Sequence, residues 1–240
     1  MLTLPNAPAD RVLDRISQTW SPWRAPHMWL LGMTGAGKTT LVRLILGWCC
    51  AAERVLVLDP KPADDPSWSC GDWPPAPIAM LRPRFGQQRD GGGPAGTWYR
   101  LTASHDPAET ARRFTAALRI VRAEGHTVLV IDDAHEICFA LGMRADVDGV
   151  LALGRSAGIS CIVASGDTGY VPRGHAAFRL AGHITGIDAA QAACKLIGQR
   201  GRDWEDTLLA LDPYQWAYFD DRPGFPGPCT FTTGAETVSL

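Results

Sequence analysis

Several features are scarce in this chain, and each scarcity excludes a class of protein. The seven cysteines form no Cys-x-x-Cys pair, which argues against a zinc site, and their odd number is typical of free thiols in a reducing cytosol. No run of about 18 apolar residues occurs, so no membrane-spanning helix is expected. The 23 Lys and Arg residues nearly balance the 25 Asp and Glu residues, and the formal net charge of −2 excludes a histone-like coat for nucleic acid.

Lysine is also rare. Lys38, Lys61 and Lys195 are the only lysines, and the remaining basic residues are arginines, a usage typical of a GC-rich genome. Each lysine is therefore worth inspecting. The first residues, Met1 to Asp14, are acidic and contain proline, which does not fit a signal peptide, so a cytoplasmic protein is expected.

The remaining composition is that of an ordinary globular protein. Of the 240 residues, 46% are hydrophobic and 20% are charged, which excludes a disordered, collagen-like or coiled-coil chain. Strand-like and helix-like apolar segments alternate, which predicts an α/β fold with a mostly parallel sheet and helices on both faces. Strands are expected at 27–31, 54–58, 97–101, 127–131, 160–164, 183–186 and 215–219.

Helices are expected between these strands. The clearest one begins after Asp106, which can cap it, with Pro107 in the first turn and Glu109 completing a capping box. It is expected to end near residue 124. The others are expected at 38–50, 147–157, 189–197 and 203–211.

Composition divides the chain into a central domain and two flanking segments. Residues 27–220 carry the alternating pattern and are expected to form one domain. Inside it, residues 60–96 contain many prolines, a glycine triplet and several arginines, and a loop this long in a compact domain is usually functional or disordered. Residues 1–26 are expected to be an N-terminal extension, and residues 221–240 a C-terminal tail.

The strongest motif is Gly32-Met-Thr-Gly-Ala-Gly-Lys-Thr39, which satisfies Gly-x-x-x-x-Gly-Lys-[Ser/Thr] in full. It follows an apolar strand and opens a helix, the context in which this motif binds a nucleoside triphosphate. The glycines let backbone N–H groups turn toward phosphate oxygens, and the helix start adds partial positive charge. Lys38 is expected to reach the β- and γ-phosphates, and the Thr39 hydroxyl to bind Mg²⁺. The predicted ATP-binding residues are Gly32, Met33, Thr34, Gly35, Ala36, Gly37, Lys38, Thr39 and Thr40.

A site of this kind needs an acid at the end of a buried strand. Asp132 and Asp133 follow the apolar residues 128–131, and Asp59 follows 55–58. We favour Asp132 as the residue that holds Mg²⁺ and Asp133 as the one that orients or deprotonates the attacking water, because hydrolysis calls for a doubled acid. The alternative for Asp133 is a simple helix cap.

Missing motifs exclude other phosphate-loop proteins. A GTPase reads guanine with Asn/Thr-Lys-x-Asp, and none of the three lysines lies in such a setting. No sequence similar to the Leu-Ser-Gly-Gly-Gln signature of ABC transporters occurs. Asp132-Asp-Ala-His135 is similar to the Asp-Glu-Ala-His box of some helicases, but their Ser-Ala-Thr motif is missing and the chain is too short for two motor lobes.

Four segments occur in a fixed order: the phosphate loop, Val57-Leu-Asp-Pro-Lys61, the acidic strand end at 129–133, and Leu153-Gly-Arg-Ser-Ala-Gly-Ile159 before a strand. Together they resemble the FtsK/HerA superfamily of DNA-pumping ATPases, whose second strand ends in Ile-Asp-Pro-Lys and whose fourth segment reads Ala-Arg-Ala-Ala-Gly-Ile. The resemblance covers residues 27–220. It implies a RecA-like P-loop core that works as a homo-oligomeric ring, usually a hexamer, and pulls double-stranded DNA through its centre.

Two departures from the family pattern concern hydrolysis. The family's catalytic glutamate is Asp133 here, one methylene shorter, so the water would be held less well. The family's sensor glutamine falls on Gly166, which cannot bond a phosphate by side chain. Ser165 or Asp167 is the available substitute, and slow hydrolysis is the alternative.

The resemblance also implies an arginine finger that a neighbouring subunit supplies to the γ-phosphate, which is worth about 10³–10⁵ in rate. Arg155 lies in the matching segment and is the first choice, with Arg144 and Arg173 as alternatives. A solvated surface arginine is the competing interpretation of each. The predicted catalytic residues are thus Lys38, Asp133 and Arg155.

Candidate DNA contacts lie in or beside the irregular segment. Arginines there can follow phosphates independently of sequence, as a translocating pump requires, and a basic loop without a ligand is the alternative. Lys61 is singled out because the resemblance suggests a role near the nucleotide or a subunit interface. The candidate contacts are Arg82, Arg84, Arg89, Arg100, Trp98 and Tyr99.

The expected function is Mg²⁺-dependent ATP hydrolysis that translocates or packages double-stranded DNA. The bare motor resembles in size the genome-packaging ATPases of membrane-containing icosahedral viruses, so a phage or mobile-element origin, a virion-associated location and a capsid or membrane-complex partner are expected. Two alternatives stay open. One is an ATP-binding switch or adaptor with weak hydrolysis, and the other a small phosphotransferase in which Asp133 activates a substrate hydroxyl.

Overall fold

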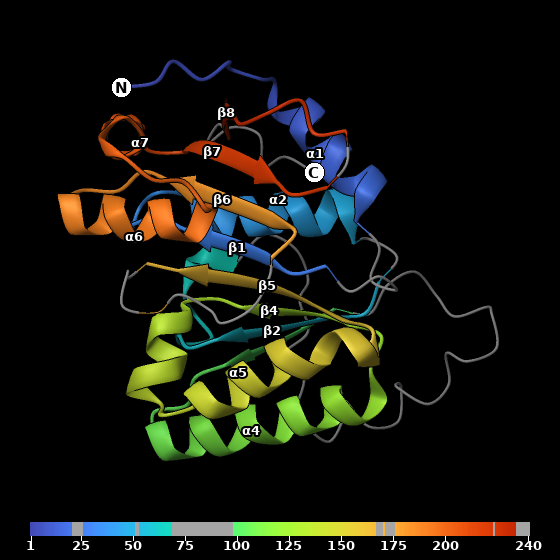
Figure 1. Cartoon of the computed structure of the whole chain (residues 1–240). Coiled ribbons are helices and arrows are strands. Elements are labelled where there is room, and N and C mark those ends of the chain that lie inside the picture. Colours follow the sequence, from blue (N-terminus) through green and yellow to red (C-terminus); the bar gives the residue numbers. More distant parts are fainter. Residues whose placement is uncertain are drawn as a thin grey trace.

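An eight-stranded sheet forms the centre of the molecule, with the strand order β3-β2-β4-β5-β1-β6-β7-β8 (Figure 1). The computed structural model describes residues 1–20, 26–50, 53–68, 98–166, 170, 176–222 and 224–233. Strands β1 to β6 run parallel, and β7 and β8 continue the sheet in antiparallel pairs. The strands are β1 (Met28–Leu31), β2 (Val55–Asp59), β3 (Trp98–Thr102), β4 (Thr127–Ile131), β5 (Ile159–Ser165), β6 (Phe178–Gly182), β7 (Gln215–Asp220) and β8 (Cys229–Thr232).

Helices cover both faces of this sheet. The helices are α1 (Ala9–Thr19), α2 (Lys38–Cys49), α4 (Pro107–Glu124), α5 (Arg144–Leu153), α6 (Ile187–Ile197) and α7 (Arg202–Leu209), with the short helices η2 (Pro66–Trp68), η4 (Glu136–Ala140) and η5 (Gly154–Ala157). Along β4, Leu129 and Ile131 join the core shared with α4, α5 and α6, whereas Val128 and Val130 join the core shared with α1 and α2. A strand buried on both faces is apolar without alternation, as these are. The predicted α/β architecture is confirmed.

The predicted helix after Asp106 forms as α4. The Asp106 side chain accepts a hydrogen bond from the Ala108 amide at 2.9 Å, so it caps the helix as expected. Glu109 instead bonds Arg112, one turn further along, at 2.6 Å. A solvent-exposed glutamate has both options, and the sequence pattern does not choose between them.

The predicted strand at 183–186 is wrong, because the strand in this region is β6, Phe178–Gly182. Phe178 and Leu180 point into one core and Ala181 into the other, while Arg179 breaks the apolar run and pairs with Asp221. Because Arg179 interrupts the apolar run, the sequence pattern does not predict a strand at these residues. Residue 183 instead meets the phosphate loop, where its carbonyl accepts a hydrogen bond from the Met33 amide at 2.9 Å.

Both flanking segments contribute regular structure. The expected C-terminal tail contains β8, and the N-terminal extension contains α1. The two meet where Asn6 bridges Thr230 and the Ala7 amide donates to the Thr230 carbonyl at 2.7 Å. Apolar residues of α1, among them Ile16, are buried in the core that also holds α2. The sheet edge is thus completed by residues from both ends of the sequence.

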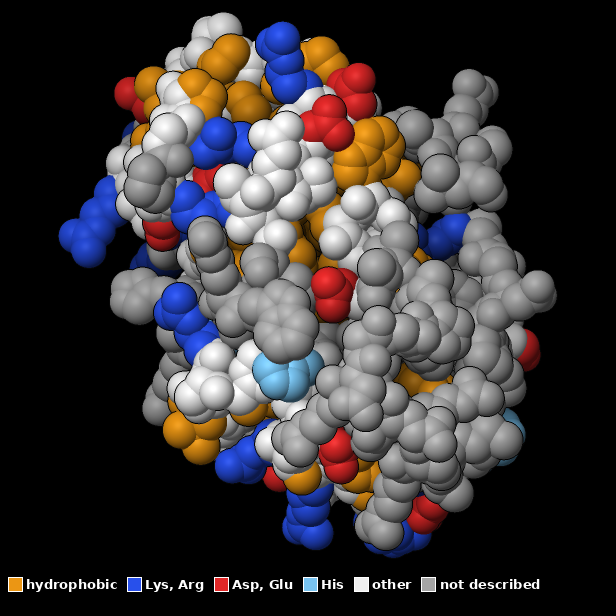
Figure 2. Space-filling view, turned by 90° about the vertical axis from the view of Figure 1, so that its right-hand side faces the viewer, with side chains coloured by type: hydrophobic (Ala, Val, Ile, Leu, Met, Phe, Trp, Pro, Cys, Tyr) orange, Lys and Arg blue, Asp and Glu red, His pale blue; other side chains and the backbone are white. Residues whose placement is uncertain are grey.

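The carboxyl ends of the parallel strands all lie at one edge of the sheet, at the left of Figure 1. Ligands of open α/β sheets bind at this edge. The opposite edge, at the amino ends, faces the viewer in Figure 2, where basic and acidic side chains are mixed on the described surface. Among the described residues, no helix combines the length and apolar character needed to cross a bilayer.

Candidate nucleotide-binding site

The phosphate loop connects β1 to α2 at the carboxyl edge. Gly35 and Gly37 have φ values of +85° and +87°, which only glycine adopts readily, so the motif glycines are required by the backbone. The Lys38 ammonium group donates to the carbonyls of Gly32 and Met33 at 2.9 and 3.1 Å. Burial lowers the pKa of Lys38, against the opposing charges of the nearby aspartates. The cation is therefore held inside the curl of the loop.

The remaining loop residues differ in exposure and position. Thr34 is exposed, Ala36 is buried, and Thr40 lies in the first turn of α2. Helix α2 begins at Lys38, directly after the second left-handed glycine. The backbone N–H groups of the first helical turn have no partner within the helix, so they are available to an anion in the loop.

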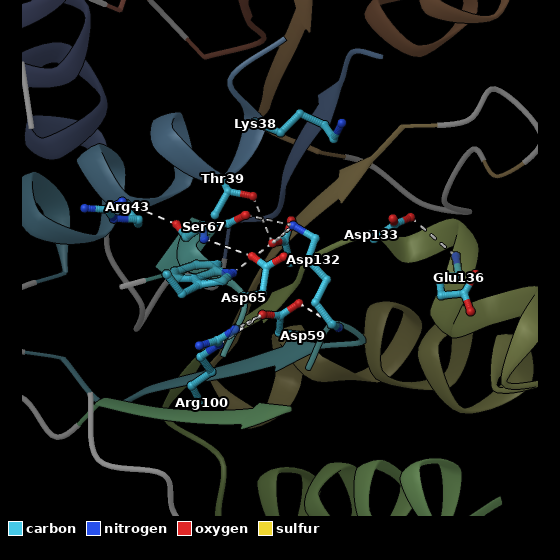
Figure 3. A network of polar contacts seen from close by, with 12 residues as sticks. Lys38, Thr39, Arg43, Asp59, Asp65, Ser67, Arg100, Asp132, Asp133 and Glu136 are labelled. Carbon is cyan, nitrogen blue, oxygen red and sulfur yellow. Dashed lines mark hydrogen bonds and ion pairs between the residues drawn. The ribbon is translucent and has the colours of Figure 1, made fainter. Parts of the chain in front are cut away.

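Asp132 lies beside the start of α2 (Figure 3). Its Oδ2 accepts a hydrogen bond from the Thr39 hydroxyl at 3.0 Å and another from the Trp68 indole N–H at 3.0 Å. Asp132 is 1% exposed. A hydroxyl and a carboxylate side by side are hard oxygen ligands of the kind that Mg²⁺ prefers, so Thr39 and Asp132 fit the predicted metal site.

Lys61 also belongs to this cluster. Its ammonium nitrogen lies 3.9 Å from Asp132 Oδ2 and 3.5 Å from the Ser67 hydroxyl. The Lys61 amide donates to Asp59 at 3.1 Å, which turns the chain from β2 toward η2. The rare lysine therefore lies close to the predicted metal site, the first of the two places, nucleotide or subunit interface, that the resemblance suggested.

Asp59, the alternative metal ligand, has a different partner. Arg100 of β3 donates to Asp59 Oδ2 from Nε at 3.0 Å and from Nη2 at 2.6 Å. Burial raises the pKa of Asp59, and the guanidinium opposes that shift. Because both Arg100 donors occupy the carboxylate, the structure favours Asp132 over Asp59 at the metal site.

The same contact corrects the prediction that Arg100 meets DNA. Its side chain is only 9% exposed and is directed inward, onto Asp59. Tyr99 is 3% exposed and packs in the core with α4, so it is also unavailable to DNA. Trp98 is half-buried. The other candidates, Arg82, Arg84 and Arg89, lie outside the described residues.

Asp133 turns away from Asp132 (Figure 3). It has φ +56°, and its Oδ1 accepts a hydrogen bond from the Glu136 amide at 3.5 Å, at the start of η4. This is the helix-cap arrangement that the sequence left as an alternative. Asp133 is partly exposed, so a role toward water is a matter for proposal.

The position of the family's sensor glutamine lies next to the phosphate loop. A Cβ atom on Gly166 would be 3.4 Å from the Lys38 ammonium nitrogen. Ser165 is buried and uses its carbonyl to accept the Gly32 amide at 3.2 Å. Asp167 lies outside the described residues. Gly166 therefore lies beside Lys38, where the resemblance would place a sensor residue, and brings no side chain to that place.

Arg155 lies at the opposite edge of the sheet. It is exposed in η5, just before the amino end of β5, whereas the phosphate loop adjoins the carboxyl end of that strand. The seven residues of β5 span ~23 Å, which an arginine side chain cannot bridge. Arg144 pairs with Asp148 at 3.6 Å, and Arg173 lies outside the described residues.

Trp68 is the site residue that sequence reasoning missed. It lies in the irregular proline-rich segment, and no spacing marks it as different from the other tryptophans. Its side chain is 1% exposed and reaches Asp132 because η2 folds back beneath α2, where Arg43 donates to the Ser67 carbonyl at 3.3 Å. Only the path of the chain reveals it.

No family model and no curated protein matches the chain. Among solved structures, the genome packaging NTPase B204 from Sulfolobus turreted icosahedral virus 2 superposes with a TM-score of 0.58 at 15% identity, over 88% of this chain and 98% of that one. The cytoplasmic domain of the Thermomonospora curvata Type VII secretion ATPase EccC gives 0.53 at 16%, over 87% of this chain and 25% of that one. The pCW3 conjugation coupling protein TcpA gives 0.51 at 11%, over 88% and 60%.

These likenesses concern architecture. They span 87–88% of this chain, at sequence identities too low to carry residue roles across. They agree with the architecture that the four ordered motifs imply. The chain therefore has the fold of the FtsK/HerA-like P-loop ATPases.

Proposed function

We propose that this protein hydrolyses ATP with Mg²⁺ and uses the energy to translocate double-stranded DNA. One observation carries the proposal: the Thr39 hydroxyl and the Asp132 carboxylate meet at 3.0 Å, directly after a phosphate loop that holds Lys38. This brings the two halves of a Mg²⁺–triphosphate site together from segments 93 residues apart. DNA as the cargo, and packaging as its purpose, are supported by the likeness to a viral genome packaging NTPase and a conjugation coupling protein.

The residues have complementary roles in this proposal. Thr39 and Asp132 would hold Mg²⁺, which neutralises charge on the β- and γ-phosphate oxygens. Lys38 would contact the same phosphates from inside the loop. Asp133 would leave its contact with the Glu136 amide and orient the attacking water, a change that the long 3.5 Å hydrogen bond allows at little cost.

The proposal includes a homo-oligomeric ring, with six subunits in the arrangement that the resemblance implies. The position of Arg155 supports it: this exposed arginine lies at the edge of the sheet opposite its own phosphate loop, so as a finger it would serve the nucleotide of a neighbouring subunit. A capsid or membrane-complex partner and a phage or mobile-element context belong to the same proposal.

The test is ATP hydrolysis by the purified full chain, with and without long double-stranded DNA, beside Lys38→Ala. Turnover that DNA stimulates and that Lys38→Ala abolishes is the expected result. For the ring, Lys38→Ala and Arg155→Ala should each be inactive alone, and mixing them should restore part of the activity, because one interface then contains an intact loop and an intact arginine. Lack of restoration in mixed oligomers would argue against Arg155 as the finger.

A second candidate function is an ATP-binding switch with weak hydrolysis. Two observations favour it: Asp133 is engaged as a cap, and the sensor position beside Lys38 is a glycine. Tight ATP binding with turnover near background, unaffected by DNA, would support the switch over the motor.

A further inference from the structure

The side of the phosphate loop away from Asp132 carries an aromatic residue in an unusual conformation. Tyr214 lies in the turn before β7 and has φ +65°, a region that bulky residues rarely adopt. The Gln215 amide donates to the Asp212 carbonyl at 3.0 Å and closes a four-residue turn, with Pro213 second. A turn with proline second and positive φ third ordinarily takes glycine at the third position. Tyrosine in this place indicates a use for the ring.

The backbone of Tyr214 is held by Thr233, a residue that directly follows the last strand of the sheet, β8. The Thr233 amide and hydroxyl both donate to the Tyr214 carbonyl, at 2.9 and 3.2 Å. Thr233 directly follows β8 and is 1% exposed. The strained turn is therefore anchored through its backbone, by a residue outside the phosphate loop.

The ring of Tyr214 lies against the last glycine of the phosphate loop. A Cβ atom on Gly37 would be 2.5 Å from Cδ1 and 2.9 Å from Cε1 of the ring, so only glycine fits beside it. Gly37 immediately precedes Lys38 and the start of α2. Tyr214 is partly exposed, so part of the residue is accessible to a ligand.

The strand order decides which end of a bound nucleotide this ring would meet. In the sheet, β1 lies between β5 and β6. Asp132 follows β4 and Gly166 follows β5, so the metal and γ-phosphate end of the site lies on that side of the loop. Tyr214 precedes β7, beyond β6, on the other side. A triphosphate that runs along the loop therefore directs its nucleoside toward Tyr214.

A second contact preorganises this side of the site. The carbonyl of His183 accepts the Met33 amide at 2.9 Å, and the His183 Nδ1 lies 2.6 Å from the Leu211 carbonyl. These contacts join the loop to the segment that leads into the Tyr214 turn. The phosphate loop and the chain that leads to Tyr214 are thereby linked on the side of the site where the ring lies.

We propose that Tyr214 is the base-recognition residue of this site, and that its ring packs against the base of the bound nucleoside triphosphate. The inference rests on the proposed function, since it requires ATP in the loop. Stacking uses the face of the base and not its hydrogen-bonding edge, so the contact favours large purine rings over pyrimidines.

Calorimetric titration of the full chain with Mg²⁺–ATP and with Mg²⁺–tripolyphosphate tests the proposal, using Tyr214→Leu and the matched control Tyr214→Phe. Leucine keeps an apolar contact with Gly37 but has no ring. Tyr214→Leu should raise the Kd for ATP ~10-fold and leave the Kd for tripolyphosphate unchanged, while Tyr214→Phe should bind both as the wild type does. The preference of the wild type for ATP over CTP should shrink in Tyr214→Leu.

The other outcomes separate two kinds of failure. Equal weakening of ATP and tripolyphosphate in Tyr214→Leu would mean that the ring only shapes the loop, and unchanged ATP binding would mean that it does not touch the nucleoside. Either result overturns the inference and leaves the ATPase proposal intact. A wild type that binds neither ligand, like Lys38→Ala, would overturn the proposed function and this inference with it.

Discussion

Two parallel strands that lie side by side in the sheet, β2 and β4, each end beside a buried aspartate, and the two carboxylates have different partners. Asp59 is neutralised by the two donors of Arg100, whereas Asp132 faces the Thr39 hydroxyl, the Trp68 indole and the Lys61 ammonium group (Figure 3). Burial is nearly the same at 0% and 1%. Two acids with nearly the same burial therefore differ in what is left open to a ligand: Asp59 is held by two close donors of Arg100 on the neighbouring strand, whereas the nearest cation to Asp132 among the described residues is 3.9 Å away.

A substitution at Asp132 should lower ATP turnover far more than the same substitution at Asp59. Asp132→Asn removes the negative ligand of the proposed Mg²⁺ site and should lower ATP turnover ~1000-fold, since a metal supplies several kcal/mol of transition-state stabilisation. Asp59→Asn is the matched control, because it makes the same change one strand away and should leave turnover within ~3-fold. Steady-state hydrolysis measures both, and equal losses would show that the two acids share the metal.

The structural side of the comparison is tested by Arg100→Met. This variant leaves Asp59 buried without its counter-ion and should destabilise the fold by about 3 kcal/mol, measured by urea denaturation. The double variant Asp59→Leu with Arg100→Met should recover most of that loss, because no charge then stays buried. If Arg100→Met instead folds as stably as the wild type and loses only DNA binding, the prediction that Arg100 contacts DNA would be correct.

Lowering the pH should change the stability of the fold in opposite directions at two buried groups, His27 and Asp59. Burial lowers the pKa of His27 to about 4, and the ring bridges the Cys161 amide and the Leu151 carbonyl, both at 3.1 Å. The unfolded chain therefore takes up this proton first, and stability present above the unfolded pKa of about 6.5 is lost as the pH falls toward 4. The pKa of Asp59 is raised, so there the folded chain takes up the proton first and a lower pH favours the folded state.

The expected loss from His27 is about 2 kcal/mol between pH 7.5 and pH 5. Urea denaturation at the two pH values measures it. His27→Asn should be less stable at pH 7.5 but should respond less to acid. An unchanged pH response in this variant would assign the acid sensitivity to other groups.

A smaller effect, on the Mg²⁺ dependence of turnover, is expected when Asp132 loses one of its hydrogen-bond donors. Trp68→Phe deletes the indole N–H and should raise the Mg²⁺ concentration for half-maximal turnover ~5-fold, since one hydrogen bond to a charged acceptor no longer orients the carboxylate. Trp48→Phe is the control, because the Trp48 indole bonds Asp14 at the exposed surface. If both variants respond alike to Mg²⁺, Trp68 acts through packing alone.

Much of the fold and site was predictable because the signals are local. The phosphate loop depends on glycine positions and one lysine within eight consecutive residues, and the buried strands β2 and β4 are continuous apolar runs. The strand β6 was missed because Arg179 interrupts its pattern, and β8 because it completes an edge whose stability comes from pairing with β7 and with residue 6. Neither β6 nor β8 therefore contains an uninterrupted apolar run that would mark it as a strand.

The amino-acid pattern alone indicates that a phosphate loop follows one strand and that acids follow two others. The sequence favours Asp132 for its doubled acid, but the different partners of the two acids depend on strand order and appear only in the tertiary structure: β3 lies next to β2 and brings Arg100 to Asp59, while Asp132, directly after β4, meets Thr39. Trp68 and Tyr214 likewise gained their positions from the path of the chain. Chain topology brings distant residues into contact, and spacing along the sequence does not encode it.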